Sequence, residues 1–195
     1  GTVINRFKNS TAGINYDQTS SRDGFNLFTN IGGAVGRNSG TMTGVKFKGL
    51  ISFNSAKNSQ NNSFLLSKFA RVGGLVGFND GTIVGNSENF VVSNAFEEFD
   101  VVSIINAHRN SANISAYNSV GGAIGFNSKV AQNLSVRTFV FADSTETAFA
   151  SINASSGVGG LAGFNLGDLI GNTVVPVVIG KINVGGLVGS SDNTE

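Results

Sequence analysis

The stretch VGGLVGFNDGTIVGN, residues 72–86, decides the fold because the chain repeats it. Related stretches begin at Ile31 (IGGAVGRNSGTMTG), Val120 (VGGAIGFNS), Val158 (VGGLAGFNLGDLIGN) and Val184 (VGGLVGSSDNTE). Each is too glycine-rich for a helix and too apolar for a flexible linker. A phrase that returns at a period of roughly 20–50 residues is typical of a solenoid, a propeller or an array.

The glycine pairs set the length of the repeating unit. They begin 41, 48, 38 and 26 residues apart, so the shortest interval approximates the minimal unit and the longer ones carry insertions. We expect one domain over residues 1–195, with a partial unit at 1–30, units at 31–71, 72–119, 120–157 and 158–183, and a partial unit at 184–195. The pairs are Gly32 and Gly33, Gly73 and Gly74, Gly121 and Gly122, Gly159 and Gly160, and Gly185 and Gly186.

Between the glycine phrases the apolar pattern is that of strands. Residues 45–53, 90–105 and 133–141 are rich in Val, Ile and Phe and partly alternate with polar residues. The best helix candidate, residues 63–72, is short and could equally be a buried strand. The pattern predicts an all-β fold, a right-handed parallel β-helix (β-solenoid) with loop insertions, the handedness following from the general preference of parallel crossovers.

Stacking gives each position of the phrase a role. Glycine pairs in register would turn the backbone with positive φ and let sheets approach closely. Asparagines two places after the last glycine would form a hydrogen-bonded ladder, and the phenylalanines before them an aromatic stack. The first copy has Arg37 and the last has Ser190 and Ser191 there, as expected of atypical outer units. The ladder residues are Asn38, Asn79, Asn127 and Asn165, and the stack residues are Phe78, Phe126 and Phe164.

The phrase resembles the GLUG motif, whose core is glycine, leucine, any residue, glycine. The match is clearest at residues 74–77, 160–163 and 186–189, whereas Ala34 and Ala123 replace the leucine in two copies. Such repeats occur in large surface and secreted proteins, including filamentous-haemagglutinin-like adhesins and non-catalytic regions of immunoglobulin-cleaving metallopeptidases. The resemblance implies a β-solenoid stalk or adhesin segment and no catalytic residue.

Composition narrows the function classes. Charged residues make up 13% of the chain, about half the usual share, and Asn, Ser, Thr and Gly replace them, which favours an extracellular or cell-surface protein. The absence of cysteine excludes disulfides, thiolate zinc sites and a cysteine nucleophile. The most apolar run, residues 170–189, contains Asn172, Pro176, Lys181 and Asn183, so we expect no membrane-spanning segment.

No residue pattern points to catalysis, a cofactor or a metal. The carboxylates do not form the facing pair that a glycosidase needs. His108 is the only histidine, no HExxH is present, and residues 105–113 around it read as a polar loop. Asp80 and Asp168 follow glycine strings at equivalent turns and leave only a weak case for calcium. The carboxylates considered are Asp80, Glu97, Glu98, Asp100, Asp143, Glu146 and Asp168.

Basic residues are the candidates for partner contact. An anionic wall polymer or glycan would suit them, whereas nucleic acid is not expected because a domain-wide positive excess is missing. The insertions near residues 54–68 and 103–118 are further candidates, since solenoid loops often carry binding. The basic residues are Lys46, Lys48, Lys57, Lys68 and Arg71.

The two ends of the sequence complement each other. Residues 184–195 read as the first half of a unit, and residues 1–13 resemble the second half, as at Gly81–Phe90. Either a longer array has been cut out of register, or separate chains stack head to tail. Residues 1–71 carry nine basic and two acidic residues, a balance of +7, and residues 72–195 carry four and ten, a balance of −6, which favours head-to-tail order.

The sequence therefore predicts a non-catalytic structural and adhesive segment of a surface or extracellular protein, assembling with itself or contacting a surface glycan or protein. The alternative is a substrate- or glycan-binding β-helix module that accompanies a secreted enzyme. A catalytic β-helix ranks third.

Overall fold

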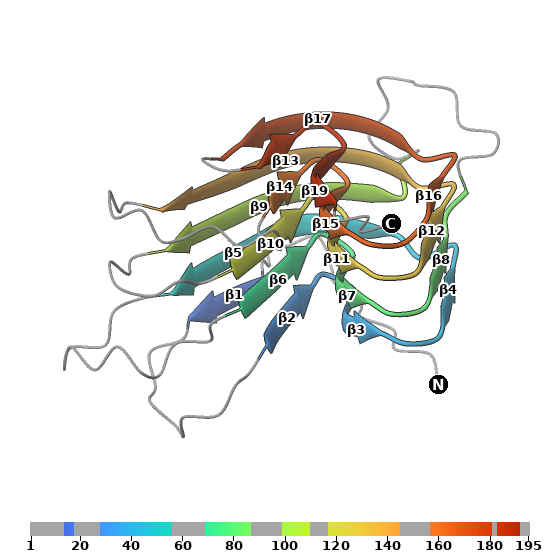
Figure 1. Ribbon diagram of the computed structural model, residues 1–195, viewed down its shortest axis with the longest axis horizontal. Helices are drawn as coiled ribbons and strands as arrows, with labels where there is room; N and C mark the ends of the chain where they lie inside the picture. The colour runs from blue at the N-terminus through green and yellow to red at the C-terminus, as the bar shows by residue number, and fades with distance from the viewer. Residues whose placement is uncertain are drawn as a thin grey trace.

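In the computed structural model, the chain is described over residues 14–17, 28–55, 69–86, 99–109, 117–144, 157–180 and 183–191. Within these ranges every regular element is a β-strand and no helix occurs. The strands recur in sets of four, and each set forms one coil (Figure 1).

Four coils are complete. The first contains β2 (Phe28–Gly32), β3 (Val35–Asn38), β4 (Thr41–Thr43) and β5 (Phe47–Ser55). The second contains β6 (Phe69–Gly73), β7 (Val76–Asn79), β8 (Thr82–Val84) and β9 (Val101–Arg109). The third contains β10 (Tyr117–Gly121), β11 (Ile124–Asn127), β12 (Val130–Gln132) and β13 (Ser135–Ser144). The fourth contains β14 (Gly157–Gly159), β15 (Ala162–Asn165), β16 (Leu169–Ile170) and β17 (Thr173–Ile179).

Partial coils flank the complete ones. β1 (Ile14–Asp17) precedes them, and β18 (Val184–Gly185) and β19 (Val188–Ser191) follow.

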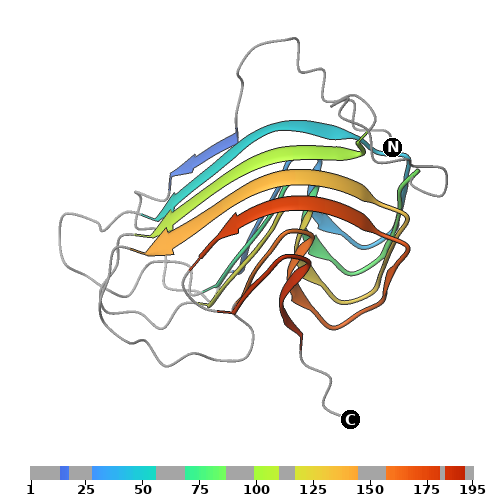
Figure 2. The ribbon, with the colours of Figure 1, turned by 90° about the horizontal axis from the view of Figure 1, so that it is seen from above.

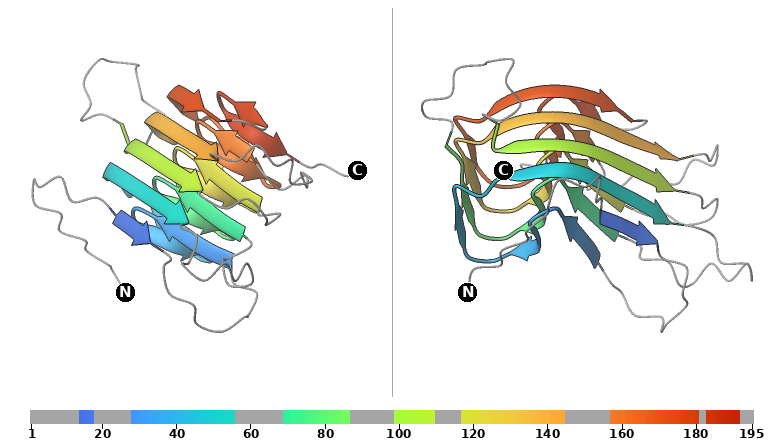
Figure 3. Two further views of the ribbon diagram at one scale, coloured as in Figure 1. Left: turned by 90° about the vertical axis from the view of Figure 1, so that its left-hand side faces the viewer. Right: turned by 180° about the vertical axis from the view of Figure 1, so that it is seen from behind.

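Equivalent strands of successive coils pair in parallel and form four sheets. Sheet A has the order β1-β5-β9-β13-β17, and sheet B has the order β2-β6-β10-β14-β18. Sheet C runs from β3 through β7, β11 and β15 to β19, and sheet D from β4 through β8 and β12 to β16. Figures 2 and 3 show the sheets side by side around a common interior. The predicted parallel β-solenoid is confirmed.

The sheets are displaced by half a coil at the two ends. Sheet A starts with β1, before any strand of sheets B and C, and ends with β17, whereas sheets B and C continue to β18 and β19. Five strands spaced at about 4.8 Å give a height of about 19 Å, but β13 with its 10 residues is about 33 Å long. The described part of one chain is therefore wider than it is tall.

The differences in unit length arise between strands. Residues 56–68, 110–116 and 145–156 come between a strand of sheet A and the next strand of sheet B, and residues 87–98 come between β8 and β9. All four segments lie outside the described residues. The expected insertion at 103–118 is partly wrong, because residues 103–109 belong to β9 and residues 117–118 to β10. His108 thus lies in a strand, in register with Asn54 and Asp143.

One apolar interior runs through the stack. The residue before the glycine pair is buried in the four complete coils, as at Val72 and Val120, and the residue after it is buried in three of them, as at Leu75 and Leu161. Sheet A contributes Ile51, Ile105 and Val140 to the same core. Burial of each side chain of this size stabilises the folded state by about 1.5–3 kcal/mol.

Candidate functional site: the notch, its ladders and the outer face of sheet A

The glycine pairs form a notch, defined here as the corner between sheets B and C in each coil. They stack in register, with Gly73 opposite both Gly32 and Gly121, and Gly159 opposite both Gly121 and Gly185. Backbone hydrogen bonds continue through the corner, from Gly33 N to Gly74 O over 3.0 Å and from Gly74 N to Gly122 O over 3.1 Å. The corner therefore repeats from coil to coil as regularly as the strands.

The second glycine of each pair lies against the inner face of sheet A. A Cβ on Gly74 would lie 2.8 Å from the Ser103 Cβ, and one on Gly160 would lie 2.5 Å from the Pro176 Cβ. The side chain of Thr138 blocks Gly122 in the same way. In the four complete coils the notch thus reaches across the interior and leaves no space for a side chain at its tip, whereas a Cβ on Gly186 in the last, partial coil would come no closer than 3.9 Å to the Pro176 Cγ.

The other glycines of the phrase let backbones approach each other. A Cβ on Gly73 would clash with the carbonyl oxygen of Val76, and one on Gly125 would lie 2.6 Å from the Val72 nitrogen. The predicted close approach is confirmed, but the predicted positive φ is wrong. Among the described glycines, positive φ occurs at Gly44 and Gly171, in the turn between sheets D and A, where Asn133 adopts it too.

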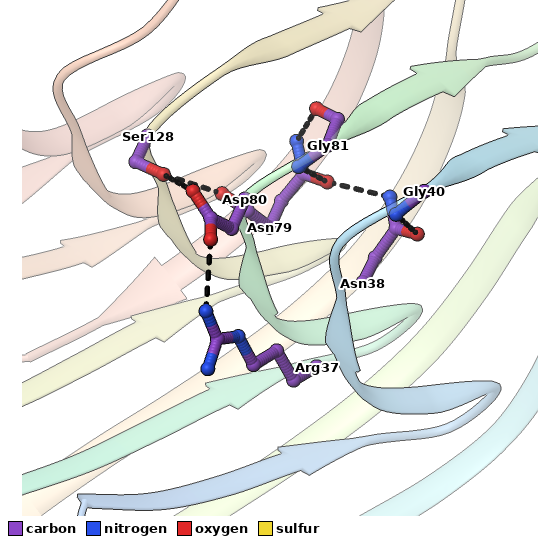
Figure 4. A network of polar contacts seen from close by, with 7 residues as sticks. All are labelled: Arg37, Asn38, Gly40, Asn79, Asp80, Gly81 and Ser128. Atoms are coloured by element: carbon purple, nitrogen blue, oxygen red, sulfur yellow. Dashed lines mark hydrogen bonds and ion pairs between the residues drawn. The ribbon is translucent and has the colours of Figure 1, made fainter.

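The asparagine ladder runs along sheet C. The Nδ2 of Asn38 donates to Asn79 over 2.8 Å, Asn79 donates to Asn127 over 2.7 Å, and Asn127 donates to Asn165 over 2.8 Å. Each side chain also closes its own turn, as Asn79 does by donating to Gly81 O over 3.0 Å (Figure 4). The predicted ladder is confirmed, and it satisfies polar groups that are buried between coils.

The phenylalanine stack lies beside the ladder. The rings of Phe78 and Phe126 are 5.4 Å apart edge to face, and those of Phe126 and Phe164 are 5.0 Å apart. Arg71 places its guanidinium 4.3 Å from the Phe78 ring and 4.6 Å from the Phe126 ring. Burial, and the charge of nearby Arg37, lower the pKa of Arg71 from its usual value. Arg71 therefore covers the aromatic stack, and its contact with a partner stays a prediction.

The first coil replaces the aromatic ring by a cation. Arg37 is in register with Phe78 and lies 5.2 Å from its ring. Its Nη2 donates to the Oδ2 of Asp80 over 2.8 Å, while Ser128 donates to the other oxygen over 3.3 Å (Figure 4). The hydrogen bond from Arg37 holds the pKa of Asp80 below its usual value of 3.8. These contacts tie three consecutive coils together.

Asp100 is a buried carboxylate that the sequence analysis did not separate from the others. Asn86 donates to it from its backbone N over 3.1 Å and from its Nδ2 over 3.0 Å. Ser135 of the next coil donates from its N over 3.1 Å and its Oγ over 3.0 Å. Asp100 therefore links Asn86 to Ser135 of the next coil, and its two carboxylate oxygens accept structural hydrogen bonds.

The remaining predicted residues are dispersed. Asp168 is exposed in a turn, and Lys46 and Lys48 are exposed near the start of β5. Glu97, Glu98, Glu146, Lys57 and Lys68 lie outside the described residues, and of Asp143 only its backbone position is described. In the part of the chain that is described, no three His, Cys, Asp or Glu side chains lie close enough together to hold a metal ion.

Sheet A presents an apolar outer face, which the sequence analysis missed. Leu50, Ile104, Phe139 and Val177 lie in one register column across four coils. They are 41%, 47%, 40% and 44% exposed. The alternation of apolar and polar residues marks each of these side chains within its own strand. Only the register between distant strands shows that they lie side by side.

The fold defines a parallel β-solenoid whose polar and aromatic repeats are used between coils. Comparison of the chain with protein-family models, curated proteins and solved structures gave no match. Within the described ranges, no helix is long and apolar enough to cross a membrane.

Proposed function

We propose that this chain is a non-catalytic structural and adhesive segment of a surface or extracellular protein, and that its coils continue end to end into a filament. The repeated cassette supports a structural role, because its asparagines, phenylalanines and glycines all serve contacts between coils. The low content of charged residues supports a surface or extracellular location.

One observation carries the proposal: the last coil exposes positions that the inner coils bury. Val184 is 44% exposed, whereas its register partner Val158 is 7% exposed and Val120 is 1% exposed. Leu187 is 47% exposed, whereas Leu161 in the preceding coil is fully buried. The end of the solenoid thus exposes apolar residues of the kind that the inner coils bury, beside a strand edge with unpaired backbone groups. Such an end can pair with a further coil.

The other end of the solenoid has the complementary step. Sheet A starts half a coil before sheets B and C, and sheets B and C end half a coil after sheet A. In a stack of two copies, β1 of one would continue sheet A beside β17 of the other, while β2 and β3 would continue from β18 and β19. Residues 1–5, GTVIN, resemble residues 81–85, GTIVG, which contain the sheet D strand β8. Such a contact is heterologous and leads to open fibres.

Sedimentation and electron microscopy of the purified chain test this proposal. We expect particles that lengthen with protein concentration in steps of one chain, and that shorten as salt rises because opposite charges meet at the contact. Deletion of residues 1–13 should leave only monomers, since it removes the strand predicted to complete sheet D. A full chain that stays monomeric at all concentrations, independently of salt, would contradict the proposal.

A matched pair of substitutions locates the contact. Leu187→Asp places a carboxylate on the exposed core position and should abolish stacking. Leu166→Asp is the control, because Leu166 is also 47% exposed but lies in the turn where the second coil has Asp80. Equal assembly by the two variants would show that the exposed end is not the contact.

A further inference from the structure

The outer face of sheet A is apolar along a narrow strip. The exposed column Leu50, Ile104, Phe139 and Val177 is one residue per coil, and the adjacent column adds Val102 and Val175. The same face carries Lys48 and Arg137 in that adjacent column and, at positions 48–50, 102–104, 137–139 and 175–179, no carboxylate. A continuous row of exposed apolar side chains on a soluble surface often marks a contact with another molecule.

The strip follows the shape of the sheet. Figure 2 shows that the long strands β5, β9, β13 and β17 bow outward together, so that sheet A is convex. Two convex surfaces of this kind touch along a line parallel to the solenoid axis. A column with one apolar side chain per coil provides such a line, and a second copy supplies side chains at the same spacing of about 4.8 Å.

We propose that this strip, Leu50–Ile104–Phe139–Val177, is a lateral contact between two copies of the chain lying side by side. A two-fold axis along the strip sets each residue opposite its own counterpart, as in an isologous interface. The solenoids then run in the same direction, so stacked copies can pair along their whole length.

The charges on the face agree with this arrangement. Lys48 and Arg137 lie to one side of the strip, and the two-fold axis carries their counterparts to the other side. They therefore do not face each other, and they remain in the wedge that opens between two convex surfaces. Long basic side chains can keep their charged ends in water while their methylene groups cover apolar surface.

The contact area determines the strength of the pairing. Four side chains bury far less than the roughly 1,600 Å² of a standard interface, so two single chains should associate weakly. Stacked chains repeat the strip, and each added copy makes the next contact intramolecular, which raises the avidity. The stronger pairing between filaments rests on the proposed function, whereas the lateral contact between two chains does not.

Because the chain contains no cysteine, a single introduced cysteine can be crosslinked at a known position. Ile104→Cys should be captured as a dimer by a bis-maleimide with a span of about 10 Å, the spacing of two sheets packed face to face. The control is Ile170→Cys, on sheet D, whose native side chain is 52% exposed. Neighbours in an end-to-end stack hold residue 104 five strand spacings apart, about 24 Å, beyond the reach of this reagent.

Crosslinking is carried out in the Leu187→Asp background, which separates lateral pairing from stacking. We expect about tenfold more dimer from Ile104→Cys than from Ile170→Cys. An excess of the chain without cysteine should lower the yield of crosslinked dimer. In the unmodified chain, Ile104→Asp should leave single filaments and remove paired ones. Equal dimer yields from the two cysteine variants would overturn the proposal. So would binding to anionic lipid vesicles that Ile104→Asp abolishes, without any captured dimer, since the strip would then face a membrane.

Discussion

The side chain of Asn79 donates to the side-chain oxygen of Asn127 over 2.7 Å, and both residues are completely buried. Asn79 also accepts from Asn38 in the coil before it, so one amide group joins three coils. An amide can do this because it donates and accepts at once, and neither Asp nor Leu could replace it in this position.

Asn127→Ala should therefore destabilise the chain strongly. The change leaves the Nδ2 of Asn79, the carbonyl oxygen of Lys129 and the Oδ1 of Asn165 each without one partner, at an expected cost of about 2–4 kcal/mol. Urea unfolding measures the loss. The control is Asn165→Ala at the end of the ladder, where Asn165 is less buried and the cost should be clearly smaller. Equal losses would show that the interior of the ladder has no special weight.

Gly122→Ala tests the tip of the notch. The new methyl group would overlap the carbonyl oxygen of Gly160 and the side chain of Thr138, so the coil must deform, at a cost of about 3 kcal/mol or more. Gly40→Ala is the matched control, because a Cβ there meets nothing within 4 Å and should change stability by less than about 0.5 kcal/mol. Thermal unfolding of the two variants is compared. A fully stable Gly122→Ala protein would contradict the notch geometry.

Asp100→Ala removes the acceptor of four hydrogen bonds. The backbone nitrogens of Asn86 and Ser135 lose their partner, and we expect a loss of about 2–3 kcal/mol. Asp100→Asn should cost less than half of this, since one oxygen remains and the amide of Asn86 can rotate to accept. Chemical denaturation of both variants gives the comparison, with the exposed Asp168→Ala as the control. A neutral Asp100→Ala would mean that water replaces the carboxylate.

The pair of Arg37 and Asp80 predicts a pH dependence. The pKa of Asp80 is lower in the folded chain than its ordinary 3.8, so the unfolded chain binds the proton more readily. The stabilisation is present above about pH 4 and is lost as the pH falls through the folded value. Asp80→Asn should remove this part of the pH profile, so that the difference from the unmodified chain shrinks toward pH 2. Because the pair is exposed, high salt should shrink the difference too, and a difference independent of pH and salt would exclude the pair as its source.

Much of the fold could be predicted from the sequence because its cassette keeps a fixed internal spacing. Asn38, Asn79, Asn127 and Asn165 occupy the same place after the last glycine, and stacking turns that coincidence into a ladder. The reason for the glycines was only half predicted. A glycine is required either by positive φ or by lack of space, and the sequence does not distinguish these causes.

Other features depend on register between distant strands. Asp100 and Ser135 are 35 residues apart and occupy the same place in successive coils. Their equivalence is not apparent from the sequence, because residues 87–98 separate Asp100 from the repeated phrase before it. The outer strip of sheet A needs the pairing of Leu50 with Ile104 and of Ile104 with Phe139. His108 was placed in a loop because its neighbours are polar, but β9 extends to Arg109 through its pairing with β5 and β13.

The backbone hydrogen bonds of all four sheets point along the solenoid axis, from one coil to the next. Each turn of the chain is therefore ordered mainly by the turn already laid down beneath it, as in a crystal that grows one layer at a time. In the filament that we propose, folding of the next layer and lengthening of the particle would be the same physical event, and a missing layer would interrupt both.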